Sequence, residues 1–133
     1  MIRYVIGAWA AAEYLLRTSL GLKIADVIED AFLTAPELLD VEVLSVLRRA
    51  VLQKRLDERR SLEALEDLVD WEVDRIAHID LVQEAWRHRH NVSAYDSFYL
   101  AAARLCGAPL ITADGPLSRA PALGIVVQNV RMS

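Results

Sequence analysis

Apolar positions along the chain follow two alternating spacings. Short apolar runs, typical of buried strands, are separated by longer segments whose apolar residues recur every three or four positions, typical of helices. The predicted strands cover residues 4–6, 32–35, 75–79, 108–114 and 125–130. The predicted helices cover residues 10–17, 23–30, 36–50, 61–69, 81–90 and 94–106, and one helical turn is predicted within residues 115–124.

Residues with strong preferences for helix ends mark several of these boundaries. Proline is favoured in the first turn, Ser, Asp and Asn at the N-cap, and Gly just after the last turn. The predicted boundary residues are Pro36, Ser61, Asp80, Asn91 or Ser93, and Gly107.

Regular alternation of strands and helices predicts an α/β fold. Connections of helical length between strands imply a mostly parallel central sheet covered by helices on both faces, which is a three-layer arrangement. A chain of 133 residues without internal repeats or linkers predicts a single domain, residues 1–133. Such folds bind their ligands at the carboxyl ends of the strands.

Net charge and composition exclude some classes of protein. The net charge of −4 argues against a generally basic nucleic-acid surface. Basic residues do gather in residues 48–60 and 86–90, either as solvated helix faces or as a local binding surface. No apolar run is long enough to span a bilayer, and the lone Cys106 fits a reducing compartment, so we predict a cytoplasmic protein.

Three carboxylates stand in apolar surroundings. Asp114 ends the strand "PLITAD", Asp96 lies on a helix of small and apolar residues, and Glu42 borders an apolar helical stripe. Carboxylates in such places usually have partners, and a shared Mg²⁺ or Mn²⁺ would relieve their repulsion. The alternative is that they face solvent, with Asp96 favoured by its helix dipole and Asp114 by a turn.

Four segments resemble, in order and spacing, the PIN-domain family, and most closely its VapC-type toxins from toxin–antitoxin pairs. They are "RYVIGAWAAAEYLL", "APELLDVEVLSVLRR", "NVSAYDSFYLAAARLCGAPLITAD" and "GPLSRAPALGI". The resemblance covers nearly the whole chain. It implies a PIN-like fold and an endoribonuclease that uses Mg²⁺ or Mn²⁺. It also implies a small VapB-like antitoxin as partner, and commonly a homodimer.

The resemblance assigns roles to individual residues. Glu42, Asp96 and Asp114 match the second, third and fourth acidic positions of the family, and are the implied metal ligands and catalytic residues. Thr112 matches the small hydroxyl residue that often precedes the last acidic position.

The first acidic position departs from the family. Where the family has Asp-Ala-Ser after the first strand, this chain has Gly7-Ala8-Trp9. Glycine offers no ligand atom, and Trp9 would add bulk at the pocket. Because a ligand is lost and bulk is added, we predict a toxin ribonuclease with weakened or lost activity. Each of the two differences needs only one base change.

RNA is a polyanion, so an acidic metal site that acts on it needs flanking basic residues. The predicted RNA-binding residues are Lys54, Arg55, Arg87 and Arg89.

Two other functions stay open. A non-catalytic PIN-like protein could bind antitoxin or RNA without cleaving it. A phosphoacceptor receiver domain is also small, α/β and acidic, but it needs acidic residues after the first strand and a lysine after one of the last strands. The two lysines, Lys23 and Lys54, lie elsewhere.

Overall fold

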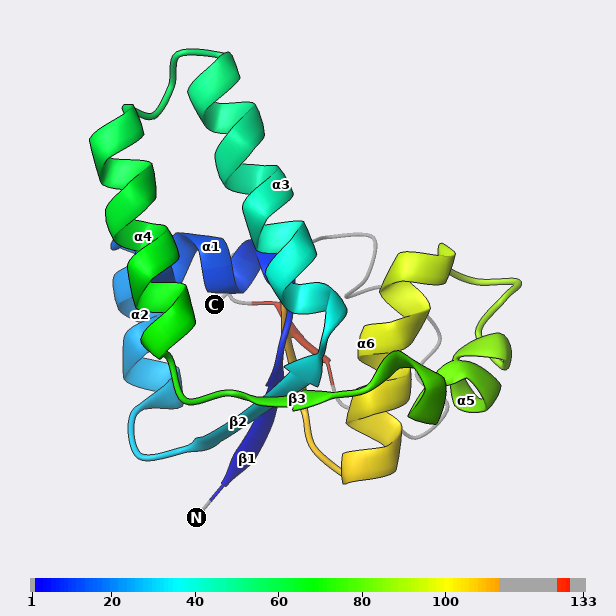
Figure 1. Ribbon diagram of the computed structural model, residues 1–133. Coiled ribbons are helices and arrows are strands. Elements are labelled where there is room, and N and C mark those ends of the chain that lie inside the picture. Colours follow the sequence, from blue (N-terminus) through cyan, green and yellow to red (C-terminus); the bar gives the residue numbers. More distant parts are fainter. Residues whose placement is uncertain (1, 113–126, 130–133) are drawn as a thin grey trace.

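The computed structural model describes residues 2–112 and 127–129, and these form one sheet flanked by helices. All strand pairs are parallel, and the order is β3-β2-β1-β4-β5 (Figure 1). The strands are β1 (Arg3–Ile6), β2 (Phe32–Pro36), β3 (Asp74–Ile76), β4 (Leu110–Thr112) and β5 (Val127–Asn129).

The helices form two layers, as the sequence predicted. The helices that connect β1 to β2 and β2 to β3 lie on one face of the sheet, and those that connect β3 to β4 lie on the other. The first layer holds α1 (Ala8–Leu16), α2 (Ser19–Ile28), α3 (Leu38–Leu52) and α4 (Glu58–Asp70). The second holds the short 3₁₀ turn η1 (His78–Asp80), α5 (Val82–Trp86) and α6 (Ala94–Cys106).

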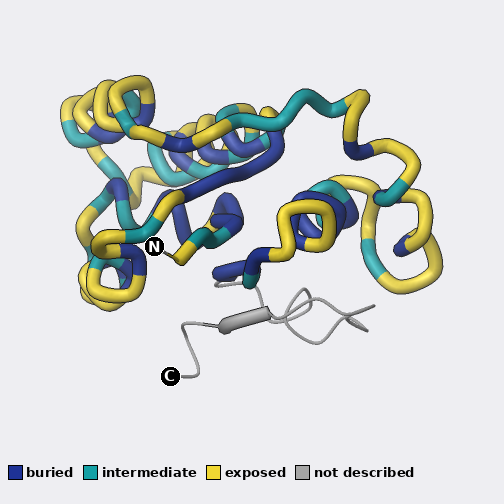
Figure 2. The backbone as a smooth tube through the Cα atoms, turned by 90° about the horizontal axis from the view of Figure 1, so that it is seen from below, coloured by how far each residue is buried: buried dark blue, intermediate teal, exposed yellow. Residues whose placement is uncertain are grey.

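Burial follows this layering. Buried residues gather in the strands and on the inward sides of the helices, while the outer sides are exposed (Figure 2). Within the described residues, no helix combines the length and apolar character needed to cross a membrane.

Helix α6 is fixed at both ends by the residues predicted to do so. The hydroxyl of Ser93 accepts a hydrogen bond from the backbone N–H of Asp96 at 3.2 Å, and Gly107 ends the helix with a left-handed φ of 59°. The buried run Ala101–Ala103 lets α6 pack closely on β1, β2 and β4. Because α6 leads into the start of β4, its first turn lies at the carboxyl edge of the sheet.

The predicted start of α4 at Ser61 is wrong. Asp57 is the N-cap, and its Oδ1 accepts a hydrogen bond from the backbone N–H of Arg60 at 2.8 Å. Ser61 is instead buried within the helix and donates its hydroxyl to the carbonyl of Glu58 at 2.6 Å. Aspartate and serine cap equally well, and the earlier cap adds helical hydrogen bonds. Within α4, Leu68 is buried, but Leu62 and Val69 are exposed.

Other predicted boundaries are also corrected. Pro36 ends β2 rather than opening a helix, because it pairs with Ile76 of β3. Helix α1 begins at Ala8, and α2 begins after Thr18, whose Oγ1 accepts a hydrogen bond from Gly21 at 3.0 Å.

The strand predicted over residues 75–79 ends at Ile76, because the chain turns into η1. Asp80 lies within that turn and does not cap α5, whose N-cap is Leu81.

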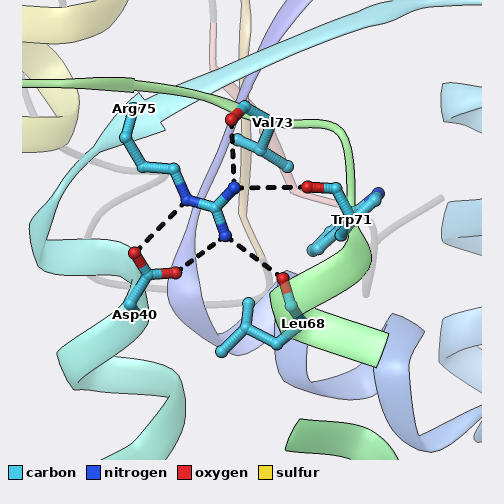
Figure 3. Close-up of polar contacts among 5 residues, drawn as sticks. All are labelled: Asp40, Leu68, Trp71, Val73 and Arg75. Carbon is cyan, nitrogen blue, oxygen red and sulfur yellow. Dashed lines mark hydrogen bonds and ion pairs between the residues drawn. The ribbon is translucent and has the colours of Figure 1, made fainter. Parts of the chain in front are cut away.

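Arg75 on β3 joins the start of α3 to the end of α4. Its Nη2 and Nε donate to the two carboxylate oxygens of Asp40 at 2.9 and 3.3 Å (Figure 3). The same guanidinium donates to the carbonyls of Leu68, Trp71 and Val73 at 3.3, 3.2 and 3.0 Å. This partly buried fork holds the first turn of α3 against the sheet.

We expect Arg75→Met to lower the free energy of unfolding by about 2–3 kcal/mol, because the bidentate ion pair and three carbonyl contacts are lost together. Urea denaturation measures the change. The matched control is Arg59→Met, which removes an exposed pair to Glu63 and should cost less than about 0.5 kcal/mol. Equal losses in the two variants would contradict a stabilising role for the fork.

Candidate functional site

The register of the central strands brings Gly7 against Thr112. Ile6 pairs with Ile111, and the N–H of Gly7 donates to the Ile111 carbonyl at 2.9 Å. A Cβ atom at Gly7 would lie 3.3 Å from that carbonyl oxygen and 3.8 Å from Thr112 Oγ1. Thr112 is itself buried. A side chain at position 7 therefore begins beside the threonine predicted to belong to the site.

Gly7 is also the N-cap of α1. Its φ of −81° and ψ of 160° lie in the extended region that any residue adopts, and no side chain caps the helix. Aspartate is among the preferred residues at this position of a helix. The backbone conformation does not require glycine here, and among the described residues the Ile111 carbonyl oxygen is the nearest atom that an added Cβ would meet.

A short hydrogen bond joins Glu42 to α6. Glu42 lies in the second turn of α3, and its Oε1 accepts a hydrogen bond from the hydroxyl of Tyr99 at 2.6 Å. Tyr99 is 2% exposed and Glu42 is half-buried. Burial raises the pKa of Glu42, the nearby charge of Asp96 raises it further, and the Tyr99 hydrogen bond partly offsets the two. Burial, followed by the charge and hydrogen bond of Glu42, raises the pKa of Tyr99 far above its usual range.

Two of the three predicted carboxylates therefore share one electrostatic neighbourhood. Asp96 in the first turn of α6 acts on both Glu42 and Tyr99. Asp114 lies outside the described residues, so the predicted convergence of all three stays a prediction. In the part of the chain that the structure describes, no group of three or more His, Cys, Asp or Glu side chains could hold a metal ion.

The described carboxylates have the chemistry that a divalent cation requires. Burial and mutual repulsion make the ionised form of Glu42 costly, and a cation beside it would remove that cost. Carboxylate oxygens are the ligands that Mg²⁺ and Mn²⁺ prefer. Glu42 and Asp96 therefore fit such a cation, while Gly7 contributes no side-chain donor.

The predicted RNA-binding residues fall into two separate places. Lys54 and Arg55 follow the end of α3, in the connection to α4 at the top of Figure 1. The end of α3 at Leu52, just before them, lies about 15 Å along the helix axis from Glu42, at about 1.5 Å per residue. Arg87 and Arg89 follow α5 and lie close in sequence to the first turn of α6.

Local contacts hold both of these arginines. Arg87 pairs with Glu84 at 3.3 Å, and the Arg89 guanidinium lies 4.9 Å from the centre of the Trp86 ring. Arg89 and Ser93, the N-cap of α6, line the same hollow between α5 and α6.

Trp9 lies in the first turn of α1, two residues after Gly7, and 42% of it is exposed. It is therefore not part of the apolar core. Its predicted effect on access to the site stays a prediction.

Sequence reasoning missed Tyr99. It stands three residues after Asp96, on the same side of α6, and this spacing was the available signal. A buried aromatic residue on an apolar helix otherwise looks like ordinary core packing.

Comparisons with known proteins agree on one family. Residues 8–123 match the PIN domain family. Ribonuclease VapC1 of Mycobacterium tuberculosis is 39% identical over 109 residues, which are 79% of this chain and 80% of that protein. Ribonuclease VapC12 of the same organism is 31% identical over 115 residues, which are 86% of this chain and 89% of that protein.

Solved structures share the fold at low sequence identity. The crystal structure of PAE2754 from Pyrobaculum aerophilum has a TM-score of 0.65 at 19% identity, covering 98% of this chain and 92% of that one. VapBC2 from Rickettsia felis, solved with a DNA fragment from its promoter, has a TM-score of 0.64 at 11% identity, covering 96% of this chain and 98% of that one.

We expect Glu42→Gln to raise the free energy of unfolding at pH 7 in EDTA. The folded-state pKa of Glu42 lies above its ordinary value of 4.5, so ionisation at neutral pH costs stability that a neutral amide does not. The gain should shrink as the pH falls toward 4.5, where the unfolded carboxyl is protonated too. Urea denaturation across this range measures it, with the exposed Glu66→Gln as control. A stability gain that grows as the pH falls would contradict the raised pKa of Glu42.

Proposed function

The chain belongs to the PIN domain family, and we propose that it is a VapC-type toxin, a metal-dependent endoribonuclease whose activity is weakened at its first acidic position. The observation that carries the proposal is the position of Glu42. It is hydrogen-bonded to Tyr99, with Asp96 close enough to shift its pKa, and α3 and α6 both begin at the carboxyl edge of the sheet. Ribonucleases named VapC that resemble this chain over most of its length support the assignment.

In this proposal Asp96 and Asp114 would hold Mg²⁺ or Mn²⁺ directly. Glu42 would hold the cation through water or orient the attacking water, and the Thr112 hydroxyl would complete the polar lining beside position 7. The bound cation supplies Lewis-acid activation of the scissile phosphate.

The weakened activity follows from Gly7. A carboxylate at this position would start next to Thr112, whereas glycine leaves the site without that donor. Mg²⁺ keeps several of its waters and accepts few protein ligands, so Asp96 and Asp114 would still hold it, but more weakly. Trp9, in the same helical turn, adds bulk against incoming RNA.

The proposed partner is a VapB-like antitoxin. Structural neighbours include VapBC2 from Rickettsia felis and a toxin–antitoxin complex from Klebsiella pneumoniae. An arginine of the antitoxin would pair with Glu42 and Asp96 through charge-assisted hydrogen bonds. We further propose that the protein is a homodimer that acts on RNA in the cytoplasm.

We expect the double substitution Gly7→Asp/Trp9→Ser to restore metal binding and magnesium-dependent RNA cleavage. Asp at position 7 supplies the absent carboxylate, so Mn²⁺ affinity measured by isothermal titration should rise at least about tenfold. The backbone of Gly7 already has a conformation that suits aspartate.

The matched control is Gly7→Asn/Trp9→Ser. Asparagine has the size and capping ability of aspartate but lacks its charge, so it should restore neither property. RNA cleavage by the unaltered chain at the rate of the double variant would show that the first acidic position is dispensable. RNA or antitoxin binding without cleavage in every variant would favour the non-catalytic alternative.

We expect the charge reversals Arg87→Glu/Arg89→Glu to weaken RNA binding and reduce its salt dependence, because these arginines lie near the start of α6. Filter binding of RNA to the Gly7→Asp/Trp9→Ser protein over a salt series measures both effects. The comparison variant is Lys54→Glu/Arg55→Glu, at the far end of α3, where a smaller loss is expected. Unchanged affinity after reversal of Arg87 and Arg89 would remove them from the RNA-binding surface.

A further inference from the structure

The hydroxyl of Tyr99 is the only hydrogen-bond donor to the Glu42 carboxylate among the residues that the structure describes. The 2.6 Å distance is that of a strong, charge-assisted hydrogen bond. Tyr99 is 2% exposed and fixed in the core, whereas Glu42 is half-buried on a side chain with three rotatable bonds. The buried Tyr99 hydroxyl, the donor, is thus held more rigidly than the Glu42 carboxylate that accepts its hydrogen bond.

The backbones on both sides of this contact are fixed by other interactions. Helix α6 is capped at Ser93 and Gly107 and packs on three strands. The first turn of α3 is held through Asp40 by the Arg75 fork. Among the described residues, only the Tyr99 hydroxyl holds the Glu42 carboxylate by a hydrogen bond.

Core packing alone does not call for a hydroxyl at this position. Phenylalanine would fill the same volume without a buried O–H that needs a partner. Tyr99 also follows Asp96 by one helical turn, so a single rigid helix carries one predicted metal ligand and the group that holds another.

We propose that Tyr99 is a positioning residue, which holds the Glu42 carboxylate in the single orientation that the metal site uses. This positioning role rests on the proposed function, which supplies the metal site that Glu42 would serve. Tyr99 touches neither metal nor RNA and acts only through Glu42.

The test uses the Gly7→Asp protein, with Tyr99→Phe and Glu42→Gln introduced singly and together. Tyr99→Phe should weaken Mn²⁺ binding, measured by isothermal titration, about tenfold, the usual effect of losing a group that orients a ligand. In the presence of Glu42→Gln it should have no further effect, because the two residues act as one unit. Tyr95→Phe, an exposed tyrosine on the same helix, is the matched control.

Metal-free crystal structures of Gly7→Asp with and without Tyr99→Phe supply a readout independent of metal and activity. We expect Glu42 to leave its position in the Tyr99→Phe protein while the backbones of α3 and α6 superimpose. Equal Mn²⁺ affinity with Glu42 unmoved, or an affinity loss that persists with Glu42→Gln, would overturn the proposal.

If the Gly7→Asp protein binds no Mn²⁺, the proposed function fails separately. The crystal structures then decide the positioning role alone: a displaced Glu42 upholds it, and an unmoved Glu42 overturns it.

Discussion

The parallel pairing of β1 with both β2 and β4 is the constraint on which the arrangement of the site depends. Parallel strands all end at one edge, so the residues that follow β1 and those that end β4 meet there. The same edge receives the start of α3 after β2 and the first turn of α6. Residues more than a hundred positions apart, such as Gly7 and Thr112, become neighbours through this register alone.

The features predicted correctly are those that short stretches of sequence encode. Alternating strands and helices were enough to predict the layered parallel fold. The ends of α6 followed from Ser93 and Gly107, because capping depends on residue type within one turn. Asp96 does act electrostatically on Glu42, but the shared site with Asp114 stays a prediction.

The predictions that failed involved choices between equivalent local signals. Asp57 and Ser61 both cap well, and the earlier cap is used because it adds helical hydrogen bonds. Pro36 suits a helix start and a strand end alike, and its place opposite Ile76 in the sheet decides the matter. The Arg75 fork and the Tyr99 contact link residues 35 and 57 positions apart, for which the sequence has no spacing rule.

Gly7 is the N-cap of α1, so the residue at this position affects both the stability of the helix and the chemistry of the site, and the two effects differ in size. Replacing a good capping residue by glycine costs a helix only a few tenths of a kcal/mol, because glycine leaves the helix N–H groups open to water. Under the proposed function, the same replacement removes a metal ligand. Selection for folding stability alone would act only weakly on such a change. A toxin can therefore lose its catalytic function at this position and keep its folded structure and its binding surfaces. The first acidic position is thus a place where a nuclease can drift into a binding protein without passing through an unfolded state.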